Sequence, residues 1–245
     1  MTDEKQPFFS HLKELRDRLV VCIIAVAIAF ILTYYFKERL FYFLMQPFVR
    51  VMPAQSSFIF TGITEAFITY FKISIVAALF VAAPVILYEF WMFVAPGLYE
   101  NEKKYVYPFI FSGSLCFILG ALFCYFIIMP NIYHFFVSYA QDFVIPMPDL
   151  KSYMSLTLKL LIIFGLIFEL PLVAFYLSRA GIINARMLAK KRRYAILSVF
   201  IISAIITPPD VVSMVLVALP LWGLFELGIL IAKVFGKKEA PHETA

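Results

Sequence analysis

The sequence has 245 residues, of which 63% are hydrophobic and only 15% are charged, and its mean hydropathy is +0.90. This composition excludes the soluble globular classes. The apolar runs are continuous rather than short and alternating, so they predict an all-α integral membrane protein and not a β-barrel. The net charge of +5 comes from short basic clusters between these runs, which does not indicate nucleic-acid binding.

The apolar runs predict a single domain, residues 1–245, with six transmembrane helices. The expected spans are residues 20–36, 66–93, 105–129, 153–177, 194–206 and 211–232. Residues 37–65 and 130–150 are expected to be loops, and residues 233–245 a charged tail.

Residues 1–18 are expected to form an amphipathic helix that lies at the membrane surface and runs into the first span. Its apolar stripe consists of Phe8, Leu12, Leu15 and Leu19.

The last two apolar runs are short. Residues 194–206 span about 20 Å as a helix, and the last run reaches Glu226 only 15 residues after it starts. Neither uninterrupted run crosses a hydrocarbon layer of about 30 Å without tilting, thinning the membrane or admitting water. We therefore expect the last two helices to be short. Distortion of the membrane and shielding by the longer helices and partner proteins are two compatible ways to accommodate them.

The distribution of Lys and Arg predicts the sidedness of the chain. Fifteen of the 21 basic residues lie in the two terminal segments and in the loops around residues 94–104 and 179–193. The three loops on the other side hold four. Because basic loops stay in the cytoplasm, both termini are predicted to be cytoplasmic.

The fourth span contains Glu169 deep within an otherwise apolar segment, followed by Pro171, which would kink the helix. An ionisable group at this depth costs on the order of 3 kcal/mol, so it usually faces the bundle interior or a wet cavity. Two interpretations stay open: a functional carboxyl group, or a neutral glutamic acid that is hydrogen-bonded to a neighbouring helix.

The sequence gives little support for enzyme chemistry, a metal or a cofactor. The cysteines lie in apolar runs without the spacing of metal ligands, and the histidines lie outside the membrane core; they are Cys22, Cys116 and Cys124, and His11, His134 and His242. Hydrolase, metalloprotease and phosphate-binding motifs are absent from the sequence.

Two acidic residues on the predicted cytoplasmic side are candidates for binding. Glu14 precedes Arg18 by four residues, and Glu102 stands beside Lys103 and Lys104. Spacing alone favours an ordinary surface ion pair for Glu14 and a solvated loop for Glu102.

Four segments resemble the TatC family, the membrane core and receptor of the twin-arginine protein translocase. They are HLKELRDRL before the first span, FVAPGLYENEKK after the second, FGLIFELP in the fourth, and LAKKRRYAILSVFIISAIITPPDVVSMVLVALPLWGLFELG. The resemblance covers nearly the whole chain, in the order that the predicted topology requires. It implies a concave, glove-like bundle in a bacterial cytoplasmic membrane.

The resemblance implies that the N-terminal region and the first cytoplasmic loop bind the Arg-Arg motif of a folded cargo's signal peptide. Glu14 and Glu102 would pair with guanidinium groups, which favour carboxylates. The other implied binding positions are His11, Leu12, Arg16, Phe93, Pro96, Leu98 and Tyr99. Lys103 and Lys104 stand where the family often has two arginines, so direct roles for these two side chains are in doubt.

The resemblance also implies partners and an energy source. Glu169 would accommodate a polar group of a single-span partner, and TatA-like and TatB-like proteins would dock on the last two helices, besides other copies of the chain. Pro47 and Asp210 match family positions on the outer side, where Asp210 is also well placed to cap the last helix. Transport would use the proton motive force and no nucleotide.

Two other functions remain to be compared with this one. A proton-coupled small-solute transporter would use Glu169 as its proton carrier, but it predicts an internal repeat that the sequence does not show. A purely structural assembly scaffold would have no affinity for peptides.

Overall fold

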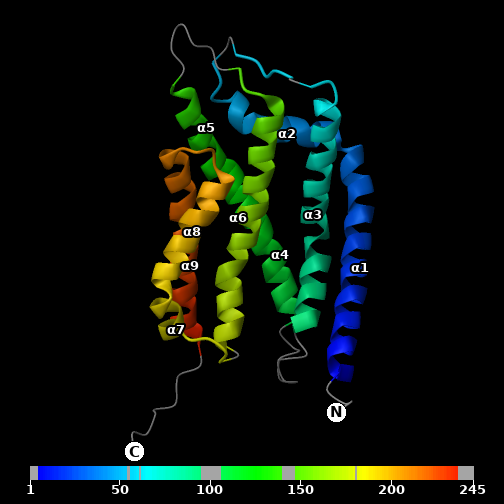
Figure 1. Ribbon diagram of the computed structural model, residues 1–245, viewed down its shortest axis with the longest axis vertical. Helices are drawn as coiled ribbons and strands as arrows, with labels where there is room; N and C mark the ends of the chain where they lie inside the picture. The colour runs from blue at the N-terminus through cyan, green and yellow to red at the C-terminus, as the bar shows by residue number, and fades with distance from the viewer. Residues whose placement is uncertain are drawn as a thin grey trace, which may run out of the picture.

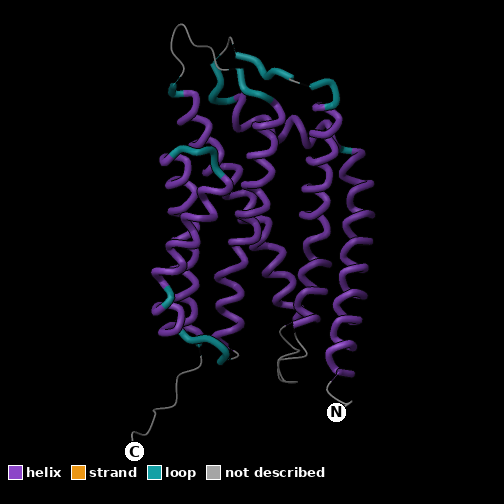
Figure 2. Tube along the Cα trace, viewed as in Figure 1, coloured by secondary structure: helices purple, strands orange, loops and turns teal. Residues whose placement is uncertain are grey.

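The computed structural model describes residues 5–53, 56–60, 62–94, 106–139, 147–179 and 181–236. These residues form helices joined by short connections, as Figure 2 shows. The helices are α1 (Lys5–Tyr35), α2 (Lys37–Val49), α3 (Glu65–Val94), α4 (Val106–Phe123), the π-helical turn η3 (Cys124–Ile128), α5 (Met129–Val137), α6 (Leu150–Arg179), α7 (Ala185–Lys190), α8 (Arg192–Ile206) and α9 (Val211–Phe235). The predicted all-α class is confirmed, since an isolated bridge between Ile59 and Asp149 is the only strand-like pairing in the described part of the chain.

Five helical segments of the described chain are long and apolar enough to cross a membrane. They are His11–Tyr35, Glu65–Phe93, Ile110–Val137, Leu150–Arg179 and Val211–Phe235. The fifth predicted span corresponds to α8, which has 15 residues and reaches only about 22 Å. Its shortness is confirmed, and a count of six crossings stays a prediction.

The prediction that the last helix is also short is wrong. Helix α9 runs for 25 residues and passes Glu226 without a break. Arg192 at the start of α8 donates a hydrogen bond of 2.6 Å to the Glu226 carboxylate. The charge is therefore paired, and the helix continues.

The structure bears on three other predicted boundaries. Residues 5–35 form one continuous helix, so the predicted N-terminal helix does run into the first span, and its position at the membrane surface stays a prediction. The predicted loop 37–65 begins with α2, which buries Leu44, Pro47 and Phe48 on one face. The third span continues through η3 into α5, so the first part of the predicted loop 130–150 is helical.

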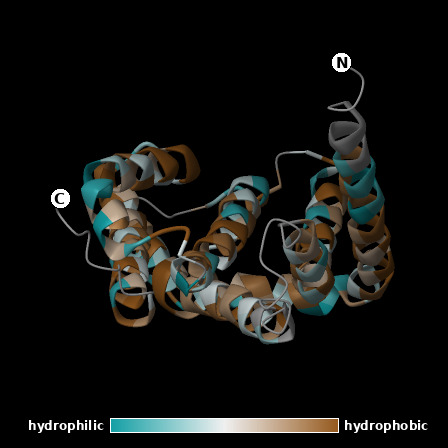
Figure 3. Cartoon of the chain, turned by 90° about the horizontal axis from the view of Figure 1, so that it is seen from below, coloured by the Kyte–Doolittle hydropathy of each residue, from teal (hydrophilic) through white to brown (hydrophobic). Residues whose placement is uncertain are grey.

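The long helices and α8 pack as a row in the order α1, α3, α4, α6, α9 and α8 (Figure 1). Seen from one end in Figure 3, this row is curved, in agreement with the expected concave bundle. Helix α1 begins and α9 ends at the same end of the bundle, and α2 and α5 lie toward the opposite end (Figure 1). We call these the terminal end and the capped end.

Hydroxyl groups of buried tyrosines hold the capped end together. Tyr125 donates a hydrogen bond of 2.7 Å to the carbonyl oxygen of Phe43, and Tyr153 donates one of 2.6 Å to that of Leu44. Tyr133 shares a 2.6 Å hydrogen bond with Thr157. Since a buried polar group is costly unless it is paired, these contacts fix α2, α5 and α6 relative to one another.

Helices α4 and α6 approach each other closely through glycine, and we call their contact the α4–α6 seam. A Cβ atom at Gly120 would overlap the carbonyl oxygen of Phe164 and lie 2.9 Å from the Cβ of Phe168. A Cβ atom at Gly165 would lie 2.7 Å from the ring of Phe117. Small residues that allow backbones to approach in this way are typical of membrane helix pairs.

Candidate functional site

A cluster of charged side chains joins α1 to α3 at the terminal end. Arg18 lies one helical turn after Glu14, so both side chains share one face of α1. The Arg18 guanidinium contacts the Glu14 carboxylate through Nη2 at 2.6 Å and Nε at 3.1 Å. Its Nη1 donates a third hydrogen bond, of 3.0 Å, to Glu89 on α3.

Glu89 is a site residue that the sequence analysis missed. It lies near the end of the apolar segment Glu65–Phe93, and its side chain is only 13% exposed. The available signal was the rule already applied to Glu169, that an ionisable residue within a span indicates a functional position. Its partner could not be read from the sequence, because Arg18 and Glu89 are 71 positions apart.

An aromatic contact lies beside the charged cluster. The rings of His11 and Phe93 are stacked, with centroids 4.4 Å apart and planes inclined by 16°. His11 Nδ1 also lies 3.8 Å from Glu14 Oε2. The structure thus brings together three of the predicted binding residues, His11, Glu14 and Phe93.

The other predicted binding residues are less informative. Leu12 is exposed, and Arg16 is exposed and bonds its neighbour Asp17 at 2.7 Å. Four predicted residues lie outside the described part of the chain: Pro96, Leu98, Tyr99 and Glu102.

Two cavities adjoin the charged cluster and share Arg18 and Glu89. The first, of about 430 Å³, is lined by Lys13, Glu14, Asp17, Arg18, Val21 and Glu89. The second, also of about 430 Å³, is an apolar groove along α1 and α3 lined by Leu15, Arg18, Leu19, Cys22, Ile23, Val26, Leu79, Ile86, Glu89, Phe90 and Phe93. A charged compartment therefore opens onto an apolar one.

Glu169 faces the interior of the bundle, as predicted. Its side chain on α6 is 8% exposed, and a Cβ atom at Gly113 on α4 would lie 3.2 Å from its Oε2. Within the described chain, neither carboxylate oxygen has a hydrogen-bond partner. The bland interpretation, a glutamic acid bonded to a neighbouring helix, is therefore not what the structure shows. A buried carboxyl group left without a partner in this way needs an explanation.

Pro47 and Asp210, the two positions predicted to lie on the outer side, have structural contacts at the capped end. Asp210 accepts a hydrogen bond of 2.6 Å from the backbone N–H of Ser213, which confirms the predicted cap of α9. Pro47 is buried within α2. Neither contact indicates a binding role.

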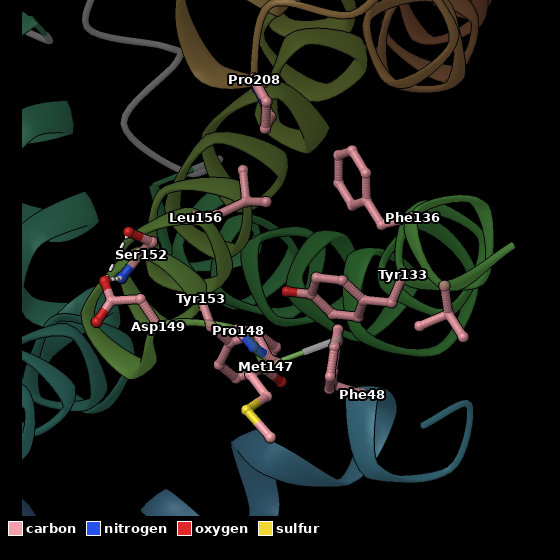
Figure 4. Close-up of a pocket in the computed structure, with 11 residues that line it drawn as sticks. Phe48, Tyr133, Phe136, Met147, Pro148, Asp149, Ser152, Tyr153, Leu156 and Pro208 are labelled. Atoms are coloured by element: carbon pink, nitrogen blue, oxygen red, sulfur yellow. Dashed lines mark hydrogen bonds between the residues drawn. The ribbon is translucent and has the colours of Figure 1, made fainter. Parts of the chain in front are cut away.

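The capped end also has a hollow of about 400 Å³, shown in Figure 4. Its walls are mostly apolar and aromatic, and they include the rings of Phe48, Tyr133 and Tyr153. The carboxylate of Asp149 at its edge is bonded to the backbone and the hydroxyl of Ser152. The described residues contain no cluster of metal-ligating side chains, here or elsewhere.

Comparison with known proteins identifies the family. The model of the family described as Sec-independent protein translocase protein (TatC) matches residues 10–220. The chain belongs to the TatC family. A TatC protein of Desulforapulum autotrophicum is 46% identical over 98% of this chain and 89% of the relative, and that of Escherichia coli K12 is 36% identical over 98% and 93%.

A solved structure agrees with the family assignment. The crystal structure of a twin-arginine translocase receptor, TatC, superposes with a TM-score of 0.83 at 39% identity, covering 91% of this chain and 97% of that one. These matches support a subunit of the twin-arginine translocase over a small-solute transporter. The chain is thus a multi-pass membrane protein of a bacterial protein-transport system, and TatC membership implies a complex with other Tat proteins.

Proposed function

We propose that this TatC protein binds the twin-arginine signal peptides of folded precursors at the cytoplasmic face of the bacterial inner membrane. Bound precursor would then nucleate assembly with TatA-like and TatB-like single-span partners for export driven by the proton motive force. The observation that carries the proposal is the position of Glu14. Its partly exposed carboxylate lines a charged cavity that adjoins an apolar groove.

The two compartments match the two chemical parts of such a peptide. A guanidinium group bonds a carboxylate through charge-assisted, often bidentate hydrogen bonds, which an ammonium group cannot reproduce in the same geometry. The apolar groove between α1 and α3 suits the hydrophobic stretch of a signal peptide. Glu102, Pro96, Leu98 and Tyr99, in the segment that follows α3 in the sequence, would complete the site.

The positions of the helix ends support a cytoplasmic location for the proposed site. Helix α1 begins and α9 ends at the terminal end, where the charged cluster also lies (Figure 1). The excess of Lys and Arg in the segments at this end favours the cytoplasmic side.

Partner proteins would dock on the other edge of the row and near Glu169. Helix α8 packs mainly against α9, and it exposes Leu197, Ile201 and Ile205 at one-turn intervals. Such a stripe suits contact with a single membrane-spanning helix. The unpartnered carboxyl group of Glu169 could accept a hydrogen bond from a polar group on a partner. Further copies of the chain would join the same complex.

The test is the affinity of the purified protein in lipid nanodiscs for a twin-arginine peptide and for the same peptide with two lysines. We expect the arginine peptide to bind more tightly, and the double variant Glu14→Gln, Glu102→Gln to lose about 30-fold or more in affinity, the scale for breaking a hydrogen-bonded charge pair. Glu226→Gln removes a paired carboxylate at the same end of the bundle and serves as the control. Unchanged binding in the double variant would exclude this site.

A further inference from the structure

We propose that Arg18 is an internal guanidinium that occupies Glu14 in the absence of peptide, and that Glu89 retains Arg18 when a peptide arginine takes Glu14. The site would therefore work by exchange of one guanidinium for another. This inference rests on the proposed function, because it concerns how the same site admits its ligand.

Arg18 binds its two acids as a ligand arginine would. Its Nη2 and Nε both contact Glu14 Oε1, at 2.6 and 3.1 Å, and Nη1 contacts Glu89 Oε2 at 3.0 Å. The guanidinium thus divides its donors between one acid on its own helix and one on α3. A guanidinium that bonds Glu14 through both carboxylate oxygens therefore competes with Arg18 for Oε1.

The exposure of the three side chains sets the order of events. Glu14 is 35% exposed, Arg18 is 21% exposed and Glu89 is 13% exposed. A peptide entering the charged cavity therefore meets Glu14 first, and Glu89 is the most shielded of the three.

The charges around the cavity are already balanced. Its lining includes three acids, Glu14, Asp17 and Glu89, and two bases, Lys13 and Arg18. Asp17 is engaged by Arg16 at 2.7 Å, which supplies a third base outside the Glu14–Arg18–Glu89 contact. An incoming guanidinium therefore replaces a contact of Arg18 and does not fill an unmatched negative charge.

Glu89 makes the exchange possible because breaking a shielded ion pair is costly when one charge is left without a partner. If a peptide arginine took Glu14 and Glu89 were absent, Arg18 would lose its remaining carboxylate. With Glu89 present, Arg18 keeps a partner throughout. Glu89 thus acts on binding through Arg18 and does not itself contact the peptide.

A double-mutant cycle on the full chain in nanodiscs tests this, with the twin-arginine peptide as the probe. We expect Arg18→Gln to tighten binding, because Glu14 becomes free. Glu89→Gln should weaken binding, because Arg18 is then held by Glu14 alone. In the double variant the effect of Glu89→Gln should vanish, giving a coupling of about fivefold or more, as is found between contacting charged groups.

Additive effects, or a loss from Glu89→Gln that persists without Arg18, would overturn the inference and make Glu89 a direct contact. Weaker binding by a folded Arg18→Gln variant would also overturn it. If wild-type protein does not prefer the arginine peptide to the lysine peptide, or Glu14→Gln has no effect, the proposed function itself fails.

Two controls keep the cycle interpretable. Arg192→Gln removes an arginine that is paired with Glu226 at the same end of the bundle. This variant should bind the peptide as tightly as the wild type. If Arg18→Gln does not fold, Arg18→Lys replaces it, since an ammonium group cannot bond both acids through a planar fork. The lysine variant should tighten binding by a smaller factor and reduce the effect of Glu89→Gln.

Discussion

Two helix contacts in this molecule differ in kind: the α4–α6 seam, and the contact between α1 and α3. In the spans that form the α4–α6 seam, Ile110–Val137 and Leu150–Arg179, 44% and 39% of the most apolar window is buried. In His11–Tyr35, which contains most of α1, only 11% is buried. The centre of the row is therefore covered by neighbouring helices, whereas α1 at its edge leaves most of its surface uncovered.

The difference follows from the residues at each contact. Glycines bring the backbones of α4 and α6 together, whereas the small core between α1 and α3 consists of Ala29, Ala78 and Ala82. On one side of these alanines, α1 and α3 are joined by the Thr33–Ser74 hydrogen bond and the Phe30–Phe71 ring contact. On the other side they line the apolar groove and are joined by the Arg18–Glu89 ion pair and the His11–Phe93 stack. The centre holds the fold, and the edge leaves surface for a ligand.

The largest effect is expected at the α4–α6 seam. Gly120→Ala would place a Cβ atom against the carbonyl oxygen of Phe164, so the two helices must move apart. We expect a loss of about 3 kcal/mol in the free energy of unfolding, at the upper end for overpacking. Thermal unfolding in detergent measures the change.

Gly223→Ala is the matched control, because a Cβ atom at Gly223 meets nothing within 4 Å. Alanine is the better helix former, so this variant should be neutral or slightly more stable. Equal stability of the two variants would show that α4 and α6 are not in close contact. The contrast between the α4–α6 seam and the α1–α3 contact would then fail.

Much of the fold was predictable because the membrane imposes it. Continuous apolar runs located the long helices, the depth of Glu169 predicted that it faces the interior, and Asp210 was identified as a cap. These features depend on residues close together in sequence, or on the cost of exposing polar groups to lipid.

The misses depend on contacts between distant segments. Residues 37–49 were expected to belong to a loop, but they form α2, whose buried face of Leu44, Pro47 and Phe48 packs against the bundle. Glu226 suggested a short last helix, but Arg192 pairs with it from 34 residues away. Glu89 was missed for the same reason, because its ion-pair partner Arg18 is distant in the sequence. Ion pairs between residues that are far apart in the chain produce no periodic pattern in the sequence.

A smaller effect is expected at α1, the edge of the row, where His11→Ala removes the stack with Phe93. Stacked rings contribute about 0.5–1.5 kcal/mol, so we expect the affinity for a twin-arginine peptide to fall about threefold to tenfold. The unfolding temperature should change little, because α1 contributes little buried surface.

Tyr139→Ala is the control for His11→Ala, since Tyr139 is an exposed aromatic residue at the capped end that contacts the ring of Phe135. Its affinity for the peptide should equal that of the wild type. A large loss of stability in His11→Ala would instead mean that the α1–α3 contact holds the fold.

The smallest expected effect is a change of stability with pH, at Asp149 before the start of α6. Hydrogen bonds from the Ser152 hydroxyl and backbone N–H lower the pKa of Asp149 below its ordinary value. A lowered pKa means that the ionised group stabilises the fold above its unfolded pKa of about 3.9, and that this contribution is lost as the pH falls through the folded pKa. Asp149→Asn should therefore be less stable than wild type by a few tenths of a kcal/mol at pH 7, since asparagine caps a helix equally well but carries no charge. The difference in unfolding temperature should shrink as the pH falls through the folded pKa of Asp149, and Ser152→Ala should make it smaller at pH 7. A difference that grows on acidification would contradict the assignment of Asp149 as the ionised cap of α6.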